Sequence, residues 1–283
     1  MAEYFTARGL PVPRELQRTP LTDWRKLGLI AAVLLVLYIG LRITDIDTGR
    51  ANPEYVLNRI ALLFRWDFSI MSPRDEFETY QNTAWWKMIE TIFLGIMATA
   101  LSMVIALPLS FLAARNIMTG NPITAAIYAV VRLLFTILRS IDVLIVVIVL
   151  IGIFGPGSAA GVFGLAFHNI GVMGKLYSEA IEGIDAGPLE AITATGANRL
   201  QVIWAAVLPQ ITNPFISFTI YRLDTNVRLA PILGLVGGGG IGLDLFQAIQ
   251  ISQYGAAGLI IFMIVVTVAT MDFVSAQVRK RLV

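Results

Sequence analysis

The sequence has no cysteine and a single histidine, His168. Without cysteine, the chain has no disulfide, no thiolate ligand for a metal and no thiol nucleophile. A catalytic triad with a histidine base would depend on His168, which stands in the apolar, glycine-rich stretch 165–171. An imidazole in such surroundings is more often a buried group bonded to a neighbouring helix. The sequence therefore predicts no catalytic residue and no metal site.

Charge is also scarce, because charged residues make up 14% of the chain, against about 25% in soluble domains. Hydrophobic residues make up 57%, and the mean hydropathy is +0.75. Several apolar stretches approach the length of about 20 residues that a helix needs to cross a bilayer. The basic residues are scattered and form no stripe that could follow a nucleic acid backbone. The composition predicts an all-α polytopic membrane protein, surrounded by membrane lipid and without a nucleic-acid partner.

Six apolar stretches are long enough to be considered as transmembrane helices. They are Leu27–Ile43, Met88–Ala113, Ile123–Ile153, Ala160–Ile181, Val202–Arg222 (or as far as Ala230) and Gly255–Val274. The third is too long for one straight crossing, so it is either a tilted or a broken helix. It also contains Arg132 and Arg139, and an arginine at the centre of a span costs about 2.5–3.5 kcal/mol on insertion scales. We expect both arginines to face protein or water.

The distribution of lysine and arginine predicts the orientation of the spans. Basic residues gather in the tail 1–26 and after the last span, whereas the stretch 44–87 is rich in acids and tryptophan. Six crossings put both termini on one side, so we expect both to be cytoplasmic. The predicted parts are a cytoplasmic tail (1–26), a first transmembrane helix (27–43), an extracytoplasmic segment (44–87) with a helix near 54–65, and a membrane core (88–283). The polar, proline-containing tail does not resemble a cleavable signal peptide.

A polar stretch, residues 183–201, separates the fourth and fifth spans. Pro188 suits the first turn of a short helix, and Glu190 would lie near the positive end of its dipole. Gly196 would end that helix, since glycine takes the left-handed conformation without strain. A second helix then leads into the fifth span. Such an elbow could transmit a movement from a cytosolic partner, although an amphipathic loop would have a similar composition.

At this elbow the sequence resembles the permeases of binding-protein-dependent ABC importers. Their coupling motif is matched in spacing by Glu190, Ala191, Gly196, Leu208 and Pro209. Two positions depart from the motif, because Ile192 replaces its second alanine and Ala206 its usual isoleucine.

Four further stretches resemble the phosphonate-importer (PhnE-like) permeases, which have the MetI-like type I importer fold. They are residues 106–116, 171–182, 221–228 and 233–242, in this order. This chain has Asp224 where that family usually has glutamate, and Asp142 where it usually has proline. These departures bear on the identity of the substrate more than on the family.

The resemblance implies a transport subunit of the bacterial inner membrane rather than an enzyme. ATP and magnesium would be bound by a cytosolic ATPase dimer, and the chain itself would hold no cofactor. The other implied partners are a second permease chain, the same or homologous, and an extracytoplasmic phosphonate-binding protein. The implied substrate is phosphonate or a related oxyanion such as phosphite or a phosphate ester. Alternatives are a permease for another small solute such as methionine, an ion-coupled secondary transporter and, last, a membrane-embedded enzyme.

Two groups of residues are candidates for the translocation path or its gate. The first consists of polar residues within or at the end of spans: Arg139, Arg222, Asp224, Asn226 and Arg228. Three of these, Arg222, Asp224 and Arg228, are expected at the outer end of the fifth span. They could lend positive potential to an anion path, or pair structurally, Asp224 with Arg228 and Asp142 with Arg139.

The second group consists of glycines after the fifth span: Gly237, Gly239 and Gly242. Their spacing fits a dinucleotide-binding fingerprint, but they follow a membrane helix and no βαβ unit surrounds them. We expect a close-packed turn on the outer side instead.

Overall fold

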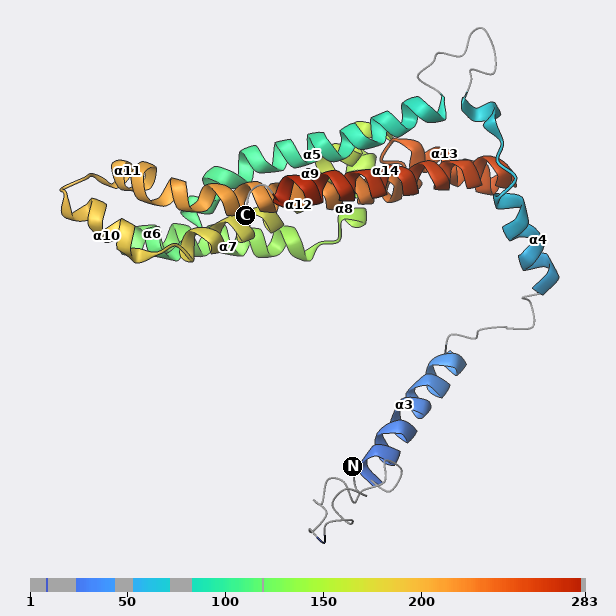
Figure 1. Ribbon diagram of the computed structural model, residues 1–283, viewed down its shortest axis with the longest axis horizontal. Coiled ribbons are helices and arrows are strands. Elements are labelled where there is room, and N and C mark those ends of the chain that lie inside the picture. The colour runs from blue at the N-terminus through green and yellow to red at the C-terminus, as the bar shows by residue number, and fades with distance from the viewer. Residues whose placement is uncertain (1–8, 10–23, 44–52, 72–82, 119, 281–283) are drawn as a thin grey trace. The chain divides into compact units, whose positions relative to one another are not determined.

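The computed structural model describes residues 9, 24–43, 53–71, 83–118 and 120–280. Every regular element in these residues is a helix, which confirms the all-α fold class (Figure 1). The chain divides into two compact units, residues 1–58 and 59–283. Most of the predicted tail, and residues 44–52 and 72–82 of the predicted extracytoplasmic segment, lie outside the described residues.

The first unit contains α3, Trp24–Ile43, a helix of 20 residues. At a rise of about 1.5 Å per residue it is as long as the hydrocarbon core is thick. It covers the first predicted span. The next helix, α4, runs from Pro53 to Leu63, as expected near 54–65.

The second unit begins within α4, at Arg59, and contains all the helices that follow it. They are a 3₁₀ turn at Phe68–Met71, α5 (Ala84–Leu112), α6 (Arg115–Met118), α7 (Pro122–Ser140), α8 (Val143–Phe154), α9 (Ser158–Glu182), α10 (Ala186–Ala194), α11 (Arg199–Val202), α12 (Leu208–Leu235), α13 (Ile241–Gln250) and α14 (Tyr254–Lys280). Four stretches are long and apolar enough to cross a membrane: α5, α7, residues 200–235 and α14. The remaining predicted spans coincide with α3, with α9 and, for the second half of the third span, with α8.

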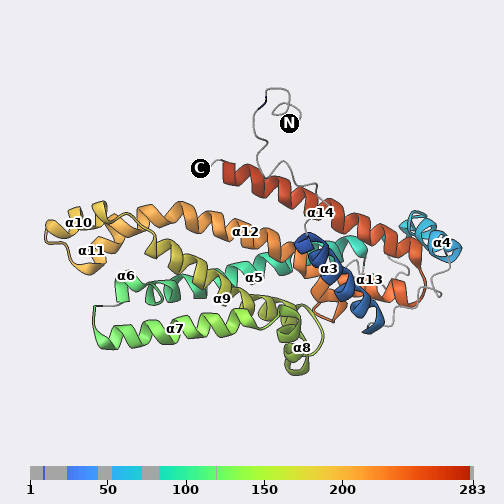
Figure 2. The ribbon, with the colours of Figure 1, turned by 90° about the horizontal axis from the view of Figure 1, so that it is seen from below.

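The third predicted span is broken rather than tilted. Its first part, α7, ends at Ser140, and Ile141 is extended. The Asp142 carboxylate then caps the next helix, α8, by accepting a hydrogen bond of 2.8 Å from the Leu144 amide. Figure 2 shows α8 turned steeply away from the direction of α7. The capping carboxylate is thus the local cause of the new helix start.

The predicted end of the fifth span is wrong, because α12 continues past Arg222 and Ala230 to Leu235. The apolar pattern is interrupted at Arg222, Asp224 and Asn226, and these polar residues suggested an interface with water. All three side chains are instead buried against other helices. Arg222 therefore lies near the middle of a membrane helix and not at its outer end, which corrects its expected position.

Helix α9 lies at the centre of the second unit and packs against α5, α7, α8 and α12 (Figure 2). Its buried face contains many small residues, which let neighbouring backbones approach closely. Gly171 faces Leu138 and the backbone of α7, and Gly174 faces the ring of Phe135. Because one face of α9 packs against four other helices, α9 is not among the stretches that are apolar enough to be recognised as spans by hydropathy.

The two ends of this bundle differ. Helices α6, α10 and α11 lie at one end, which we call the elbow end (Figure 1). The turn Gly237–Gly242 and α13 lie toward the other, which we call the glycine end. Since α12 runs from one end to the other, it connects both of the predicted functional regions.

Candidate functional site

The elbow consists of α10, a reversal at Gly196, and α11. The Asp185 carboxylate caps α10 by accepting from the Gly187 amide at 3.1 Å. Gly196 has a φ of +82°, as predicted, and its amide donates to the Thr193 carbonyl at 3.0 Å. The second helix has a reciprocal cap, since the Asn198 and Gln201 side chains each accept from the other's backbone amide. Both helix starts and the reversal are therefore specified by local sequence.

Gln210, a side chain of α12, forms hydrogen bonds that hold the start of the elbow. Gln210 accepts a hydrogen bond from the Asp185 amide at 2.9 Å and donates to the Ala206 carbonyl at 2.9 Å. Leu189 of α10 packs against the buried cluster that includes Tyr177 and Phe215, whose rings stack at 4.2 Å. The first helix of the elbow is thus fixed to the membrane helices on one side only.

The opposite side of α10 is free on this chain. Glu190 and Ala191, the first two motif residues, are exposed. The expectation that Glu190 lies at the positive end of the helix dipole is wrong, because α10 begins at Ala186 and its first turn contains no acid. The charge at that end comes from Asp185 instead. Since the dipole effect fades after one turn, Glu190 is available to a partner rather than engaged by its own helix.

The remaining motif residues, Leu208 and Pro209, lie where the elbow becomes the membrane helix. Between α11 and α12, residues Ile203–Val207 form a π-helical turn. Pro209 follows the π turn directly, and because it has no amide hydrogen it donates no backbone hydrogen bond to that turn. The chain is helical without interruption from Arg199 to Leu235. The second helix of the elbow and α12 therefore form one continuous helical segment.

A row of polar side chains lies inside the bundle between α5, α9 and α12. Arg222 donates from Nη2 to Oδ1 of Asn169 in a short hydrogen bond. One turn further along α12, Asn226 donates to the Thr99 hydroxyl at 2.8 Å, and Thr99 donates to the Gly95 carbonyl. Arg222 is 8% exposed, and Asn169 and Asn226 are fully buried. The α12 face that carries Arg222 and Asn226 is thus directed into the protein.

Asp224 and Arg228 lie on a different face of α12. The expected pair is long, at 3.4 Å, and Arg228 makes a closer ion pair of 2.6 Å with Asp272 of α14. Nothing in the sequence pattern indicated Asp272, because its partner is 44 residues away. These charges link two membrane helices, and Arg228 itself is exposed.

The two arginines of the third span have different environments. Arg132 faces protein, as expected, and forms an ion pair of 2.6 Å with Glu182 of α9. Arg139 is exposed, and its expected pair with Asp142 is absent from the ion pairs of the described residues. Asp142 is engaged instead as the cap of α8.

His168 donates from Nδ1 to the Ile141 carbonyl at 3.0 Å, so it has the structural role that its apolar surroundings predicted.

The predicted close-packed turn is present at the glycine end. Gly237, Gly239 and Gly240 have positive φ angles of +98°, +84° and +75°. A Cβ atom on Gly239 would lie 2.7 Å from the Ser158 amide nitrogen, and Gly242 lies directly against the Pro231 carbonyl. The turn follows the helix α12, so the dinucleotide fingerprint is coincidental. Only glycine fits this close approach of backbones.

Helix α5 holds the turn in place. The Thr91 hydroxyl accepts a hydrogen bond of 2.8 Å from the Ile241 amide. Glu90 accepts from the Ser158 hydroxyl at the start of α9 and pairs with Lys87 at 3.1 Å. Glu90 and Thr91 were not predicted as site residues, although an acid near the end of an apolar span was a visible signal.

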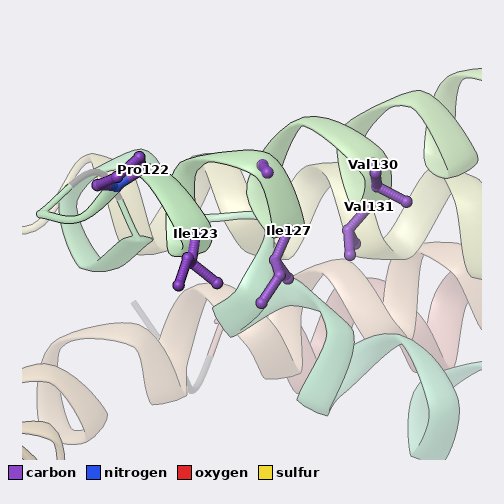
Figure 3. A pocket seen from close by; sticks show the side chains of 6 residues that line it. Pro122, Ile123, Ile127, Val130 and Val131 are labelled. Atoms are coloured by element: carbon purple, nitrogen blue, oxygen red, sulfur yellow. The ribbon is translucent and has the colours of Figure 1, made fainter.

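Three surface hollows formed by the described residues have apolar linings. Figure 3 shows one of about 550 Å³ along α7, lined by Pro122, Ile123, Ala126, Ile127, Val130 and Val131. It contains no group that could hold an anion, and its lining suits lipid or another helix. Across the described ranges, no cluster of three or more His, Asp or Glu residues could hold a metal ion.

Comparison with known proteins gives a consistent set of relatives. Residues 106–283 match the family "Binding-protein-dependent transport system inner membrane component". The chain is 34% identical to the phosphite transport system permease protein PtxC of Stutzerimonas stutzeri, over 99% of both chains. It is 31% identical to the phosphate-import permease protein PhnE of Mycolicibacterium smegmatis, and there the match covers 92% of this chain and 54% of that protein. It is 45% identical to a putative cryptic phosphonate transport system permease protein, PhnE2 of Escherichia coli, over 42% of this chain and 98% of that protein.

The fold also matches solved structures. An inward-facing MetNI methionine ABC transporter contains a chain with a TM-score of 0.61 and 22% identity, and the match covers 71% of this chain and 96% of that one. A chain of an amino acid ABC transporter gives a TM-score of 0.57 at 18% identity, covering 68% and 91% of the two chains. At these identities the likeness concerns the fold alone.

Proposed function

The chain belongs to the family of binding-protein-dependent transport system inner membrane components, and we propose that it carries phosphonate or a related phosphorus oxyanion, such as phosphite or a phosphate ester, across that membrane. The substrate class is supported by the names of the relatives, which are permeases for phosphite, phosphate and phosphonate. The transport role is supported above all by the elbow at residues 183–201. Its first helix, α10, is exposed, and its second helix, α11, continues without a break into α12.

In this proposal the elbow is the coupling element. Two copies of a cytosolic ATPase bind ATP and magnesium and dock on α10 near Glu190 and Ala191. Gly196 sets the reversal, and Leu208 and Pro209 join the elbow to the membrane helix. When ATP binding closes the ATPase dimer, the elbow moves and α12 moves with it. The transport path then changes its access from one side of the membrane to the other.

The other proposed partners follow from the same role. A second permease chain, identical or homologous, completes the path, and an extracytoplasmic binding protein delivers the oxyanion. The elbow end, the tail 1–26, both termini and the residues after α14 are proposed to be cytoplasmic. Helix 27–43 is the first crossing, the segment 44–87 is extracytoplasmic, and residues 88–283 form the permease core.

The path itself is proposed to follow α12. Asn226 and Arg222 contribute polar groups inside the bundle, Asp224 contributes a buried carboxylate, and Arg139 and Arg228 contribute charge at the surface. Gly237, Gly239 and Gly242 form the gate at the glycine end.

Reconstitution tests the proposal. The chain would be purified with its ATPase, placed in lipid vesicles with the binding protein, and supplied with ATP. We expect the binding protein to stimulate ATP hydrolysis and the vesicles to take up phosphite, methylphosphonate or phosphate. Uptake of methionine alone would favour the alternative of a permease for another solute. Uptake that needs an ion gradient but no ATPase would contradict an ABC importer.

A further inference from the structure

Arg222 is a buried cation without a counter-charge. It lies near the middle of α12 and is 8% exposed. Among the residues that the structure describes, no carboxylate forms an ion pair with it. The acids on the same group of helices are engaged elsewhere, Asp224 with Arg228 and Glu182 with Arg132. A buried guanidinium normally has a carboxylate partner, because an isolated charge in a low-dielectric interior is costly.

The hydrogen-bonding capacity around Arg222 is also incomplete. Its Nη2 is bound to Asn169, but its Nε is buried without a partner. Nδ2 of Asn169 and Oδ1 of Asn226 are likewise buried and unpartnered. Buried polar atoms are satisfied in most proteins, so three such atoms on adjoining side chains require an explanation.

The three unpartnered atoms have the chemistry of an oxyanion site. The Arg222 and Asn169 nitrogens are donors, and a guanidinium fork matches the oxygens of a phosphonate or phosphate group. The Asn226 oxygen, one turn further along the same face of α12, is an acceptor. It could bind the hydroxyl of an oxyanion that still carries one proton. Two donors, one positive charge and one acceptor complement a singly protonated phosphorus oxyanion.

We infer that Arg222, Asn169 and Asn226 form the contact that receives a phosphorus oxyanion within the membrane during transport. The inference rests on the proposed function and names the residues that hold its substrate. The site is nearly closed in the present conformation. It lies between α9 and α12, and α12 is continuous with the elbow. Movement of the elbow therefore changes the access of an anion to Arg222.

The substitution Asn169→Asp separates this role from a structural one. It keeps the size of the side chain and places a carboxylate beside the guanidinium, so it supplies the missing counter-charge. A purely structural arginine would retain its function with a better partner. An arginine that must bind the transported anion would instead be occupied by the new carboxylate. We expect the yield and thermal midpoint of the complex to be kept or raised, while uptake per complex falls about tenfold or more.

The measurement is uptake into vesicles containing the full complex with its ATPase and binding protein. The probe is whichever of phosphite, methylphosphonate and inorganic phosphate the wild-type complex imports. Stimulated ATP hydrolysis is recorded in the same samples, and we expect it to persist, so more ATP is consumed per imported anion. Asn213→Asp, at an exposed position of α12, is the matched control for an added charge, with uptake within about twofold of wild type.

A second variant tests the charge itself. Arg222→Gln retains a donor for Asn169 but has no positive charge, and we expect uptake per complex to fall by a similar factor. If Asn169→Asp imports the probe at the wild-type rate, the inferred contact is wrong, whatever the yield of Arg222→Gln. The same holds if uptake and stimulated ATP hydrolysis fall in equal proportion in Asn169→Asp. Those results leave the proposed function intact, whereas a wild-type complex that imports none of the three probes overturns both.

Discussion

The imidazole Nδ1 of His168 donates a hydrogen bond of 3.0 Å to the carbonyl oxygen of Ile141, the residue at which the helix is broken between α7 and α8. A break inside a membrane leaves backbone carbonyls without their helical partners, and these must be satisfied by other groups. His168 on α9 supplies such a group from a neighbouring helix. The single histidine of the chain is therefore explained by the break in the third span.

Replacing His168 tests this role. In His168→Leu, the Ile141 carbonyl loses its side-chain partner in a low-dielectric setting, which we expect to cost about 1–3 kcal/mol. The thermal midpoint of the purified complex should fall, while uptake per folded complex stays close to that of wild type. His168→Gln, which can donate again, should recover part of the loss. A collapse of uptake at unchanged stability would instead assign the imidazole to transport.

Gly196 should be required for coupling. A side chain at its φ of +82° is strained, by about 1–2 kcal/mol for an ordinary residue and more for a β-branched one. We expect Gly196→Val to insert normally and to lose both uptake and the stimulation of ATP hydrolysis by the binding protein. Asparagine tolerates the left-handed region, so Gly196→Asn should retain much of both. Equal activity in the two variants would contradict the role of this reversal.

The ion pair between Arg132 and Glu182 should stabilise the packing of α7 on α9. Both side chains are about one-quarter exposed, and their atoms are 2.6 Å apart. A double-mutant cycle with Arg132→Gln and Glu182→Gln should give a coupling energy of about 1.5–3 kcal/mol, since the hydrogen bond is charge-assisted. Unfolding of the detergent-solubilised protein would be measured for all four forms. Additive effects would mean that the pair contributes nothing on its own.

The turn at the glycine end should not tolerate a side chain at Gly239. In Gly239→Ala the new Cβ atom meets the Ser158 backbone at 2.7 Å, at a φ of +84°. We expect a clear loss of folded complex or, where the turn adjusts, of uptake. Gly152, on α8, has no atom within 4 Å of its Cβ position, so Gly152→Ala is the matched control and should behave like wild type. Similar results for the two variants would show that the turn is not tightly packed.

The proposed orientation has a direct test, because the chain has no native cysteine. Gln253 lies in the turn before α14 and Ala194 lies in α10, and both are exposed. Gln253→Cys should react with an impermeant thiol reagent in intact spheroplasts, and Ala194→Cys only after the membrane is permeabilised. The reverse pattern would place the elbow outside and remove the ATPase docking site with it.

Local features of this protein were predictable from the sequence. The reversal at Gly196 and the turn at Gly237–Gly242 require backbone conformations that only particular residues adopt readily. Asp142 precedes an apolar run, and such an aspartate is a signal for a helix start. It could have decided between a broken and a tilted third span.

The contacts between distant residues were not predictable in this way. Asn169 and Asp272 acquire their roles from partners on other helices, Arg222 and Arg228. In the sequence they are single polar residues in apolar stretches. The predicted position of Arg222 was wrong for a related reason. Its polar side chain suggested contact with water, whereas the structure buries it inside the bundle. The rule that polar residues mark the end of a span fails when a bundle provides polar partners inside it.

The π-helical turn at Ile203–Val207 lies where the elbow joins α12. A π turn holds one residue more than an α-helical turn, so the turn itself takes up the extra residue, and deleting one residue within it would restore regular helix with little change in the direction of α10. Each residue of an α-helix advances about 100° around the axis. Deleting one residue after Pro209, in the α-helical part, would therefore rotate the elbow by about that angle relative to the rest of α12. The ATPase would then meet a different face of α10. The number of α-helical residues between Pro209 and Arg222 thus acts as an angular register, which aligns the moving parts of the transporter before any contact between them is made.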